Sequence, residues 1–265
     1  MGFRAYGFVA VLAFLPVTAY AQNAGPALKT TLDAPHREAA FKARDGARNP
    51  AASLDFWGLK PGITVLEVSP GGGYWSEILA PYALATKGKY IAAMGNANQR
   101  LPAKFADTGA YGTINYTVFG RDSGPLAPAG SVDLILTARN IHNWVPQGIA
   151  DKAFADFYAA LKPGGILAVE EHRSDPLPTA EKVSTGYMHT NDVIALATKA
   201  GFRLDGRSEI NANGKDTKDH PYGVWTLPPT RRGPAAGAQP APGFEQAKYD
   251  AIGESDRMTL RFVKP

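Results

Sequence analysis

The sequence predicts a three-layer α/β domain built on a largely parallel sheet. Short apolar segments rich in β-branched residues alternate along most of the chain with segments of helical period. Turns rich in glycine or proline separate the two kinds of segment. A helix that connects two parallel strands crosses back over one face of their sheet, so this alternation places helices on both faces.

The individual elements follow from these local patterns. Strands are expected at residues 63–68, 88–94, 114–119, 132–137, 166–170, 202–210 and 258–263. The run at 63–68 is apolar and β-branched, which is typical of a buried strand, and 132–137 is almost wholly apolar. Helices are expected at 35–47, 54–59, 74–82, 148–161 and 191–200, with one more that begins near Pro102. Residues 211–256 form a long insertion before the last strand, in which 223–227 has the composition of a strand. Loops of this length usually have a function or are disordered.

Composition narrows the function classes. The chain of 265 residues carries 28 Lys plus Arg against 24 Asp plus Glu, a formal net charge of +4. This small excess, without a dense basic stripe, argues against a nucleic-acid partner. Cysteine is absent, which excludes disulfides, thiolate metal sites and a cysteine nucleophile. Hydrophobic residues make up 45 % of the chain, enough for one full core.

The N-terminal residues have the pattern of an export signal. Arg4 supplies a basic start, residues 5–17 form an apolar run too short to span a bilayer, and 19–21 end in a small-x-small motif. We therefore expect a cleaved signal peptide at 1–21, a linker at 22–34 and one domain at 35–265. The expected location is periplasmic or secreted, with no stable membrane insertion after cleavage.

A glycine-rich turn is the strongest local signal in the chain. It joins the first predicted strand to a helix through Glu67-Val68-Ser69-Pro70-Gly71-Gly72-Gly73. Glycines let the backbone approach a ligand, and the start of the following helix offers free N–H groups. The same residues also suit a tight turn that binds nothing.

Together with two later motifs, this turn resembles the class I S-adenosylmethionine-dependent methyltransferases. The second motif is the strand Val132-Asp133-Leu134-Ile135-Leu136 with the following Arg139-Asn140-Ile141-His142-Asn143-Trp144. The third is Leu161-Lys162-Pro163-Gly164-Gly165-Ile166-Leu167. The three motifs occur in the family's order within residues 60–175. The resemblance implies a Rossmann-like, mostly parallel seven-stranded sheet with an antiparallel last strand, and S-adenosylmethionine as cofactor without a metal.

Further segments are similar to a narrower group of exported, mostly uncharacterised bacterial predicted methyltransferases. These segments are residues 70–82, Glu171-His172-Arg173, Thr217-Lys218-Asp219-His220-Pro221 and Gly253-Glu254-Ser255-Asp256-Arg257-Met258.

The resemblance also implies a set of cofactor-binding residues. Carried over position by position, they are Glu67, Ser69, Gly71, Gly73, Tyr74, Asn96, Arg121, Asp122 and Asn140. Two positions depart from the family pattern. Ser69 stands where the first glycine is usual, and Asn96 stands where many members have the acid that holds the ribose hydroxyls. Asn96 can donate and accept hydrogen bonds, so it is a weaker replacement for that acid.

Candidate catalytic residues follow the fourth and fifth predicted strands. Methyl transfer to oxygen or nitrogen needs an aligned nucleophile and a group that takes a proton. His142 is the first candidate for a general base and His172 the second, and Glu171 is placed to orient either one. Asn140 and Tyr187 complete the catalytic set. Tyr74, Trp75, Trp144 and Tyr187 are candidates for the wall of an acceptor pocket or for core packing.

Several alternatives stay open beside a methyltransferase that acts on a small-molecule acceptor. One is a non-catalytic periplasmic binding protein on the same fold. Another is a metal-dependent hydrolase or lyase that uses a rim of histidines, because four of the five, at positions 142, 172, 189 and 220, are expected at one edge. The candidate ligands are Glu171, His172, His189 and His220. The segment that contains Arg44, Asp45 and Arg48 either folds over the cofactor site or forms an exposed helix.

Overall fold

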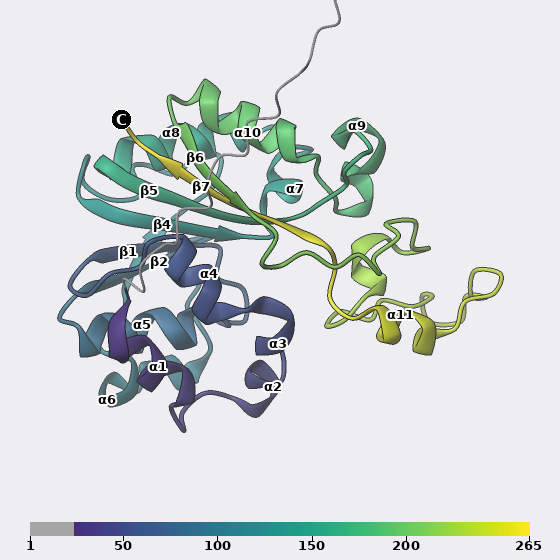
Figure 1. The fold of residues 1–265 in the computed structure, drawn as a ribbon, viewed down its shortest axis with the longest axis horizontal. Coiled ribbons are helices and arrows are strands. Elements are labelled where there is room, and N and C mark those ends of the chain that lie inside the picture. Colours follow the sequence, from purple (N-terminus) through teal and green to yellow (C-terminus); the bar gives the residue numbers. More distant parts are fainter. Residues whose placement is uncertain (1–23) are drawn as a thin grey trace, which may run out of the picture.

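One seven-stranded sheet organises the molecule (Figure 1), in a computed structural model that describes residues 24–265. Its strands are β1 (Thr64–Val68), β2 (Lys89–Met94), β3 (Asn115–Val118), β4 (Val132–Ala138), β5 (Leu161–His172), β6 (Arg203–Ser208) and β7 (Arg257–Val263). The order across the sheet is β3-β2-β1-β4-β5-β7-β6. The pairs from β3 to β5 are parallel, whereas β7 is antiparallel to both of its neighbours. The predicted α/β fold with an antiparallel last strand is confirmed.

Helices cover both faces of this sheet. On one face lie α1 (Gly25–Asp33), α4 (Pro50–Phe56), α5 (Ser76–Ala85) and α6 (Thr108–Tyr111), and on the other α7 (Ile141–Trp144), α8 (Ala150–Ala160) and α10 (Thr190–Lys199). The remaining helices are α2 (Ala39–Lys42), α3 (Asp45–Arg48), α9 (Thr179–Lys182) and α11 (Gln246–Ile252). Three short 3₁₀ helices are η1 (Ala103–Ala106), η2 (Val183–Thr185) and η3 (Gly223–Thr226).

The sheet divides the apolar core into two clusters. Phe154 and Phe157 of α8 pack with Val193 of α10 on one face, and all three are fully buried. Leu54 of α4 and Ile78 of α5 belong to the cluster on the other face. Because each helix buries its apolar stripe against the sheet, both clusters hold the strand ends in fixed positions.

The structure differs from the sequence prediction at four segments. The helix expected to begin near Pro102 is the 3₁₀ helix η1, followed by the separate short helix α6. In place of the linker expected at 22–34, α1 packs on the core, with Leu28 buried and the Tyr82 hydroxyl donating to the Ala24 carbonyl at 3.0 Å. Pro26 stands in the first turn of α1, where a missing N–H costs no hydrogen bond, so this proline starts a helix. The helix expected at 35–47 is split into α2 and α3. The strand-like segment 223–227 forms η3 instead.

One prediction concerns residues that the structure does not describe. The expected signal peptide at 1–21 lies outside the described residues. Among residues 24–265, none of the helices combines the length and the apolar character that crossing a membrane requires.

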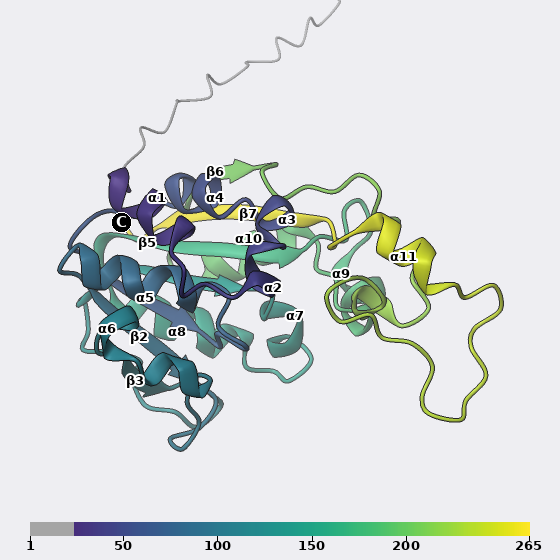
Figure 2. The same cartoon turned by 90° about the horizontal axis from the view of Figure 1, so that it is seen from below.

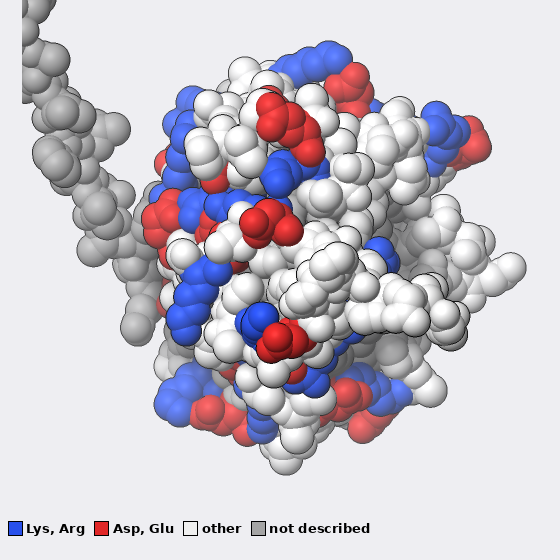
Figure 3. Space-filling view, turned by 90° about the vertical axis from the view of Figure 1, so that its right-hand side faces the viewer, with Lys and Arg blue, Asp and Glu red and all other residues white. Residues whose placement is uncertain are grey.

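The insertion between β6 and β7 lies beyond the carboxyl ends of the parallel strands. Figures 1 and 2 show it, with α11, projecting from that end of the sheet. Figure 3 looks at this end and shows acidic and basic side chains intermingled on it. The insertion therefore stands next to the edge where ligands bind in sheets of this kind.

Candidate active site

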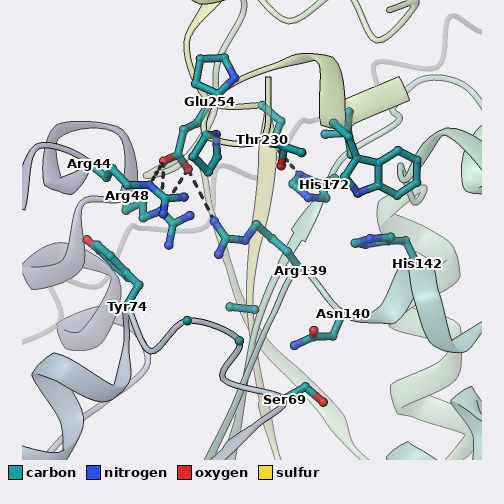
Figure 4. Close-up of a pocket in the computed structure, with 18 of the residues that line it drawn as sticks. Arg44, Arg48, Ser69, Tyr74, Arg139, Asn140, His142, His172, Thr230 and Glu254 are labelled. Atoms are coloured by element: carbon teal, nitrogen blue, oxygen red, sulfur yellow. Dashed lines mark hydrogen bonds and ion pairs between the residues drawn. The ribbon is translucent and has the colours of Figure 1, made fainter. Parts of the chain in front are cut away.

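A cavity of about 320 Å³ opens at the carboxyl ends of β1, β4 and β5 (Figure 4). Its volume lies within the range of small-molecule sites. Five parts of the chain form its wall: the α2–α3 segment, the glycine-rich turn, the residues after β4, the end of β5, and the insertion with its return to β7. The lining includes Phe41, Arg44, Arg48, Ser69, Pro70, Gly71, Gly72, Tyr74, Arg139, Asn140, His142, His172, Trp225, Glu254 and Ser255.

The glycine-rich turn uses its glycines for two different purposes. Gly71 has φ +58°, and a Cβ added there would meet no atom within 4 Å, so this position leaves space at the cavity. At Gly73, with φ +91°, an added Cβ would lie 2.6 Å from the Phe105 ring, so this glycine permits close packing. Ser69 has φ +52°, the left-handed conformation that glycine favours. Ser69, which replaces the usual glycine, therefore adopts the backbone conformation of that glycine, and this conformation is strained in serine.

His142 is held by Glu171 at the cavity wall. The Nδ1 atom of His142 lies 2.9 Å from Oε1 of Glu171. The other oxygen of this fully buried carboxylate accepts a hydrogen bond from the Ile141 backbone N–H at 2.6 Å. A carboxylate so held favours the tautomer with a proton on Nδ1, which leaves the Nε2 lone pair of His142 for a ligand. This pairing of the first base candidate with its predicted orienting acid is what proton transfer requires.

His172 lies beside this pair. Its ring centroid is 5.2 Å from that of His142, and its Nδ1 atom is 2.6 Å from the Ser255 hydroxyl. Burial lowers the pKa of His172 well below its usual value, and the nearby His142 and Arg139 lower it further. His172 is therefore neutral near pH 7, and its contact with Ser255 fixes its ring.

The histidine rim expected for a metal enzyme is not assembled. His189 accepts a hydrogen bond from the Asn191 N–H at the start of α10, and buried His220 lies 2.8 Å from Asp216. Neither belongs to the cavity lining. A different trio, His142, Glu171 and His172, places one possible ligand atom from each residue within 4.8 Å of the others. Both oxygens of Glu171 already accept hydrogen bonds, so this carboxylate is better suited to orienting His142 than to binding an ion.

Two predicted site residues lie next to the turn. The Asn140 amide donates to the Val68 carbonyl at 3.1 Å and so ties the residues after β4 to the end of β1. The Tyr74 ring lines the cavity, and its hydroxyl donates to Asp45 at 2.7 Å.

Two other predicted site residues, Glu67 and Tyr187, form hydrogen bonds inside the protein. Glu67 lies behind the turn, where its Oε2 atom accepts from the hydroxyls of Tyr90 and Ser76 at 2.6 and 2.8 Å. Burial raises the pKa of Glu67 to about 7. Tyr187 is fully buried and donates its hydroxyl to Asp216 at 3.0 Å. Neither side chain lines the cavity, although the Tyr187 ring stands 6.1 Å from that of His172.

The remaining cofactor candidates stand apart from the cavity. Asn96 follows β2, and Arg121 and Asp122 follow β3; all three are exposed and none belongs to the lining. The Asn96 side chain accepts from the Gln99 N–H at 2.9 Å, which stabilises its own loop. Trp75 and Trp144, considered as pocket walls, are core residues instead.

Several wall residues were not among the predicted site residues. Figure 4 shows Arg139 and Arg48 pointing toward Glu254. The segment with Arg44 and Arg48 lies against the cavity, so it does not form the freely exposed helix that was the other possibility. Trp225 of the insertion presents its ring at 6.0 Å from that of His142. Arg139 and Glu254 belong to the segments through which the sequence resembles methyltransferases. Their place in those segments is the signal that could have identified them.

Comparisons with known proteins agree with this fold. No protein-family model matches the chain. The ubiquinone/menaquinone biosynthesis C-methyltransferase UbiE of Hydrogenovibrio crunogenus is 25 % identical over 136 residues, which cover 51 % of this chain and 52 % of that protein. The chain thus spans about half the length of the curated relative it matches.

Solved structures extend the likeness to most of the chain. A SAM-dependent methyltransferase from Aquifex aeolicus has a TM-score of 0.50 at 23 % identity, covering 69 % of this chain and 91 % of that one. The (4+2)-cyclase SpnF has a TM-score of 0.52 at 15 % identity, covering 83 % of this chain and 80 % of that one. The chain therefore has the class I methyltransferase fold. Proteins with this fold differ in activity, so the fold alone does not identify the reaction. The reaction depends on the residues of the site.

Proposed function

We propose that this protein is an S-adenosylmethionine-dependent methyltransferase that acts on a small-molecule acceptor. The support is the class I fold, the partial similarity to a C-methyltransferase, and a cavity at the edge of the sheet where such folds bind ligands. A proton acceptor, His142, stands at the wall of this cavity.

The residues of the cavity suit this cofactor. Gly71 leaves open space beside the turn, and Ser69 and Pro70 line the same wall. Asn140 lies next to them at the cavity wall, where its amide nitrogen donates to the Val68 carbonyl. These residues would hold the cofactor along the turn, with Asn96 and Asp122 as further candidates at the ends of β2 and β3. Bound S-adenosylmethionine would supply a methyl group made electrophilic by its sulfonium.

The chain's own residues would align the acceptor and remove its proton. His142 Nε2 would take the proton that an acceptor hydroxyl or amine loses when it receives the methyl group. Glu171 stabilises the resulting imidazolium through the hydrogen bond to Nδ1. Trp225 and Phe41 line the cavity and would offer apolar surface to the body of the acceptor.

One observation carries this proposal: His142, held from behind by the buried Glu171, lines the cavity together with the glycine-rich turn. The test is a screen of hydroxylated and aminated small molecules for formation of S-adenosylhomocysteine by the full chain. We expect His142→Ala to lower the turnover of any acceptor found by about 10²-fold or more while cofactor affinity stays unchanged. His189→Asn is the matched control, because asparagine also caps a helix and His189 lies outside the cavity.

Two outcomes would contradict the proposal. A chain that does not bind S-adenosylhomocysteine would favour a binding protein for other ligands on the same fold. Turnover that survives in His142→Ala, or that is lost equally in His189→Asn, would remove His142 from the reaction.

We also propose export by the N-terminal residues. The support is the signal-like pattern of residues 1–21. The test is N-terminal sequencing of the protein from the periplasmic fraction of a bacterial host. A chain that begins at Gln22 supports the proposal, and an uncleaved chain found only in the cytosol contradicts it.

A further inference from the structure

Three arginines from two distant parts of the sequence meet at one side of the cavity. Arg44 and Arg48 come from the α2–α3 segment, and Arg139 follows β4. All three contact Glu254, at 2.7 Å from Arg44, 3.0 Å from Arg48 and 3.5 Å from Arg139. We call these three residues the arginine cluster.

The acidic groups nearby do not neutralise this cluster. Arg257, behind the cavity wall, pairs with Glu170 at 2.6 Å and with Glu254 at 3.2 Å. Four guanidinium groups thus share the carboxylates of Glu254 and Glu170, which leaves an excess of two positive charges. Arg48 and Arg257 are buried, whereas the side chains of Arg44 and Arg139 are 20 % and 21 % exposed. Positive charge so largely removed from water is costly unless a partner neutralises it.

Donor groups also remain for such a partner. Arg48 is 1 % exposed, and its buried Nη1 atom has no hydrogen-bond partner among the described residues. Arg139 approaches Glu254 only at 3.5 Å, longer than a good hydrogen bond between N–H and oxygen. Burial lowers the pKa of Arg139, and the charges of Arg257 and Arg44 also lower it. Arg139 in addition has φ +61°, a strained backbone that directs its side chain from the end of β4.

The aromatic ring of Tyr74 completes the arrangement. The Arg48 guanidinium lies over this ring, 4.3 Å from its centroid. Planar guanidiniums that are stacked in this way keep a fixed direction, and they match the geometry of carboxylate and phosphate oxygens.

From this geometry we infer that Arg44, Arg48 and Arg139 form a binding subsite for a carboxylate or phosphate group of a ligand in the cavity. Two sources have this chemistry. One is the anionic group of an acidic acceptor, and the other is the amino-acid carboxylate of the cofactor. The inference for the second source rests on the proposed function, whereas the subsite itself does not.

The experiment uses calorimetric titration of the full chain in chloride buffer with inorganic phosphate and with benzoate. Each anion is titrated alone and in the presence of saturating S-adenosylhomocysteine. We expect both to bind, and Arg139→Gln to weaken at least one of them by about tenfold or more. The ion pair of Arg139 with Glu254 is long, at 3.5 Å, so we expect this variant to keep the fold. Arg203→Gln, 64 % exposed on β6, is the control and leaves both affinities unchanged.

A second variant and a truncated nucleoside separate the two sources. If the subsite serves the acceptor, the anions bind together with S-adenosylhomocysteine, and Arg139→Gln and Arg44→Gln leave the affinity for S-adenosylhomocysteine unchanged. If it serves the cofactor, phosphate competes with S-adenosylhomocysteine. Both variants then weaken S-adenosylhomocysteine about tenfold, but not 5′-methylthioadenosine, which lacks the carboxylate.

One result would overturn the subsite, and a different result would overturn only the proposed function. The subsite is overturned if neither anion binds at about 10 mM and both variants bind S-adenosylhomocysteine as the wild type does. If the anions bind but S-adenosylhomocysteine does not, the subsite stands and the proposed function fails.

Discussion

The Nδ1 atom of His142 lies 2.9 Å from Oε1 of Glu171, and this contact joins the short helix after β4 to strand β5. Strands β4 and β5 are parallel neighbours with Ala138 opposite Glu170, so their carboxyl ends meet at one edge. The acid that orients the ring is thus supplied by the adjacent strand, and the free nitrogen of the ring is left to the cavity.

We expect Glu171→Gln to damage both stability and turnover. An amide places two N–H donors where the carboxylate accepts from the Ile141 and His172 backbone N–H groups, so at least one donor loses its partner. A loss of about 1–3 kcal/mol in the free energy of unfolding is expected, together with a fall in turnover of about 10²-fold or more. Urea denaturation and initial rates measure the two effects. Unchanged turnover in a folded Glu171→Gln protein would show that Glu171 does not orient the base.

Ser69→Gly is expected to stabilise the protein. A left-handed serine costs about 1–2 kcal/mol relative to glycine, and the greater freedom of glycine in the unfolded chain offsets part of this. The expected net gain in the free energy of unfolding is about 0.5–1 kcal/mol. Urea denaturation measures it, with Ser131→Gly, which has negative φ, as the control. A Ser69→Gly protein less stable than the wild type would mean that Ser69 makes a favourable contact at the turn.

Glu67 makes stability depend on pH near neutrality. Burial raises its pKa in the folded protein to about 7, against an ordinary value of 4.5. Its stabilising contribution is therefore complete below pH 4.5 and is lost as pH rises through about 7. The full effect is on the order of 3 kcal/mol. We expect Glu67→Gln to remove it, so that the wild type loses stability relative to this variant between about pH 5 and pH 8. If the unfolding free energies of the wild type and Glu67→Gln change with pH in parallel, the raised pKa of Glu67 is contradicted.

Glu254 is expected to hold the arginine cluster together. Glu254→Gln removes a charge that four guanidiniums share, and the expected loss is about 3–5 kcal/mol in the free energy of unfolding. Added phosphate should restore part of the loss by occupying the cluster. The control is Glu209→Gln, a 71 % exposed partner of Arg173, with an effect below about 1 kcal/mol. Thermal unfolding in chloride and in phosphate measures both variants. Equal stability of Glu254→Gln and wild type would show that the cluster needs no internal anion.

The central strands were predictable because they are short runs in which buried β-branched or apolar residues predominate, as in β1 and β4. Runs such as Val132–Ala138 have almost no alternative to a buried strand. Helix α1 was not predictable from its own residues, since few of them are apolar and its helical state depends on Leu28 packing in the core. The segment 223–227 contains Val224 and Trp225, which suit a strand, yet it has no strand partner in the insertion and forms η3.

The candidate site was predictable where residues directly follow neighbouring strands. His142 and Glu171 meet because the carboxyl ends of β4 and β5 meet. Residues farther along a connection are placed by tertiary packing instead. His189 became the cap of α10, and His220 turned into the core toward Asp216. Trp225 and Glu254 reach the cavity from opposite ends of the insertion, and no local pattern specifies where such a loop returns.

The most direct test of the account is calorimetric titration of the full chain with S-adenosylhomocysteine, on the wild type, Gly71→Ala and Gly62→Ala. Gly71 and Gly62 both have positive φ, +58° and +79°, so both substitutions strain the backbone, but only Gly71 lines the cavity. The account predicts micromolar binding by the wild type and by Gly62→Ala, and affinity at least about tenfold weaker in Gly71→Ala. Absence of binding by the wild type at millimolar ligand, or equal affinity in all three proteins, would contradict it.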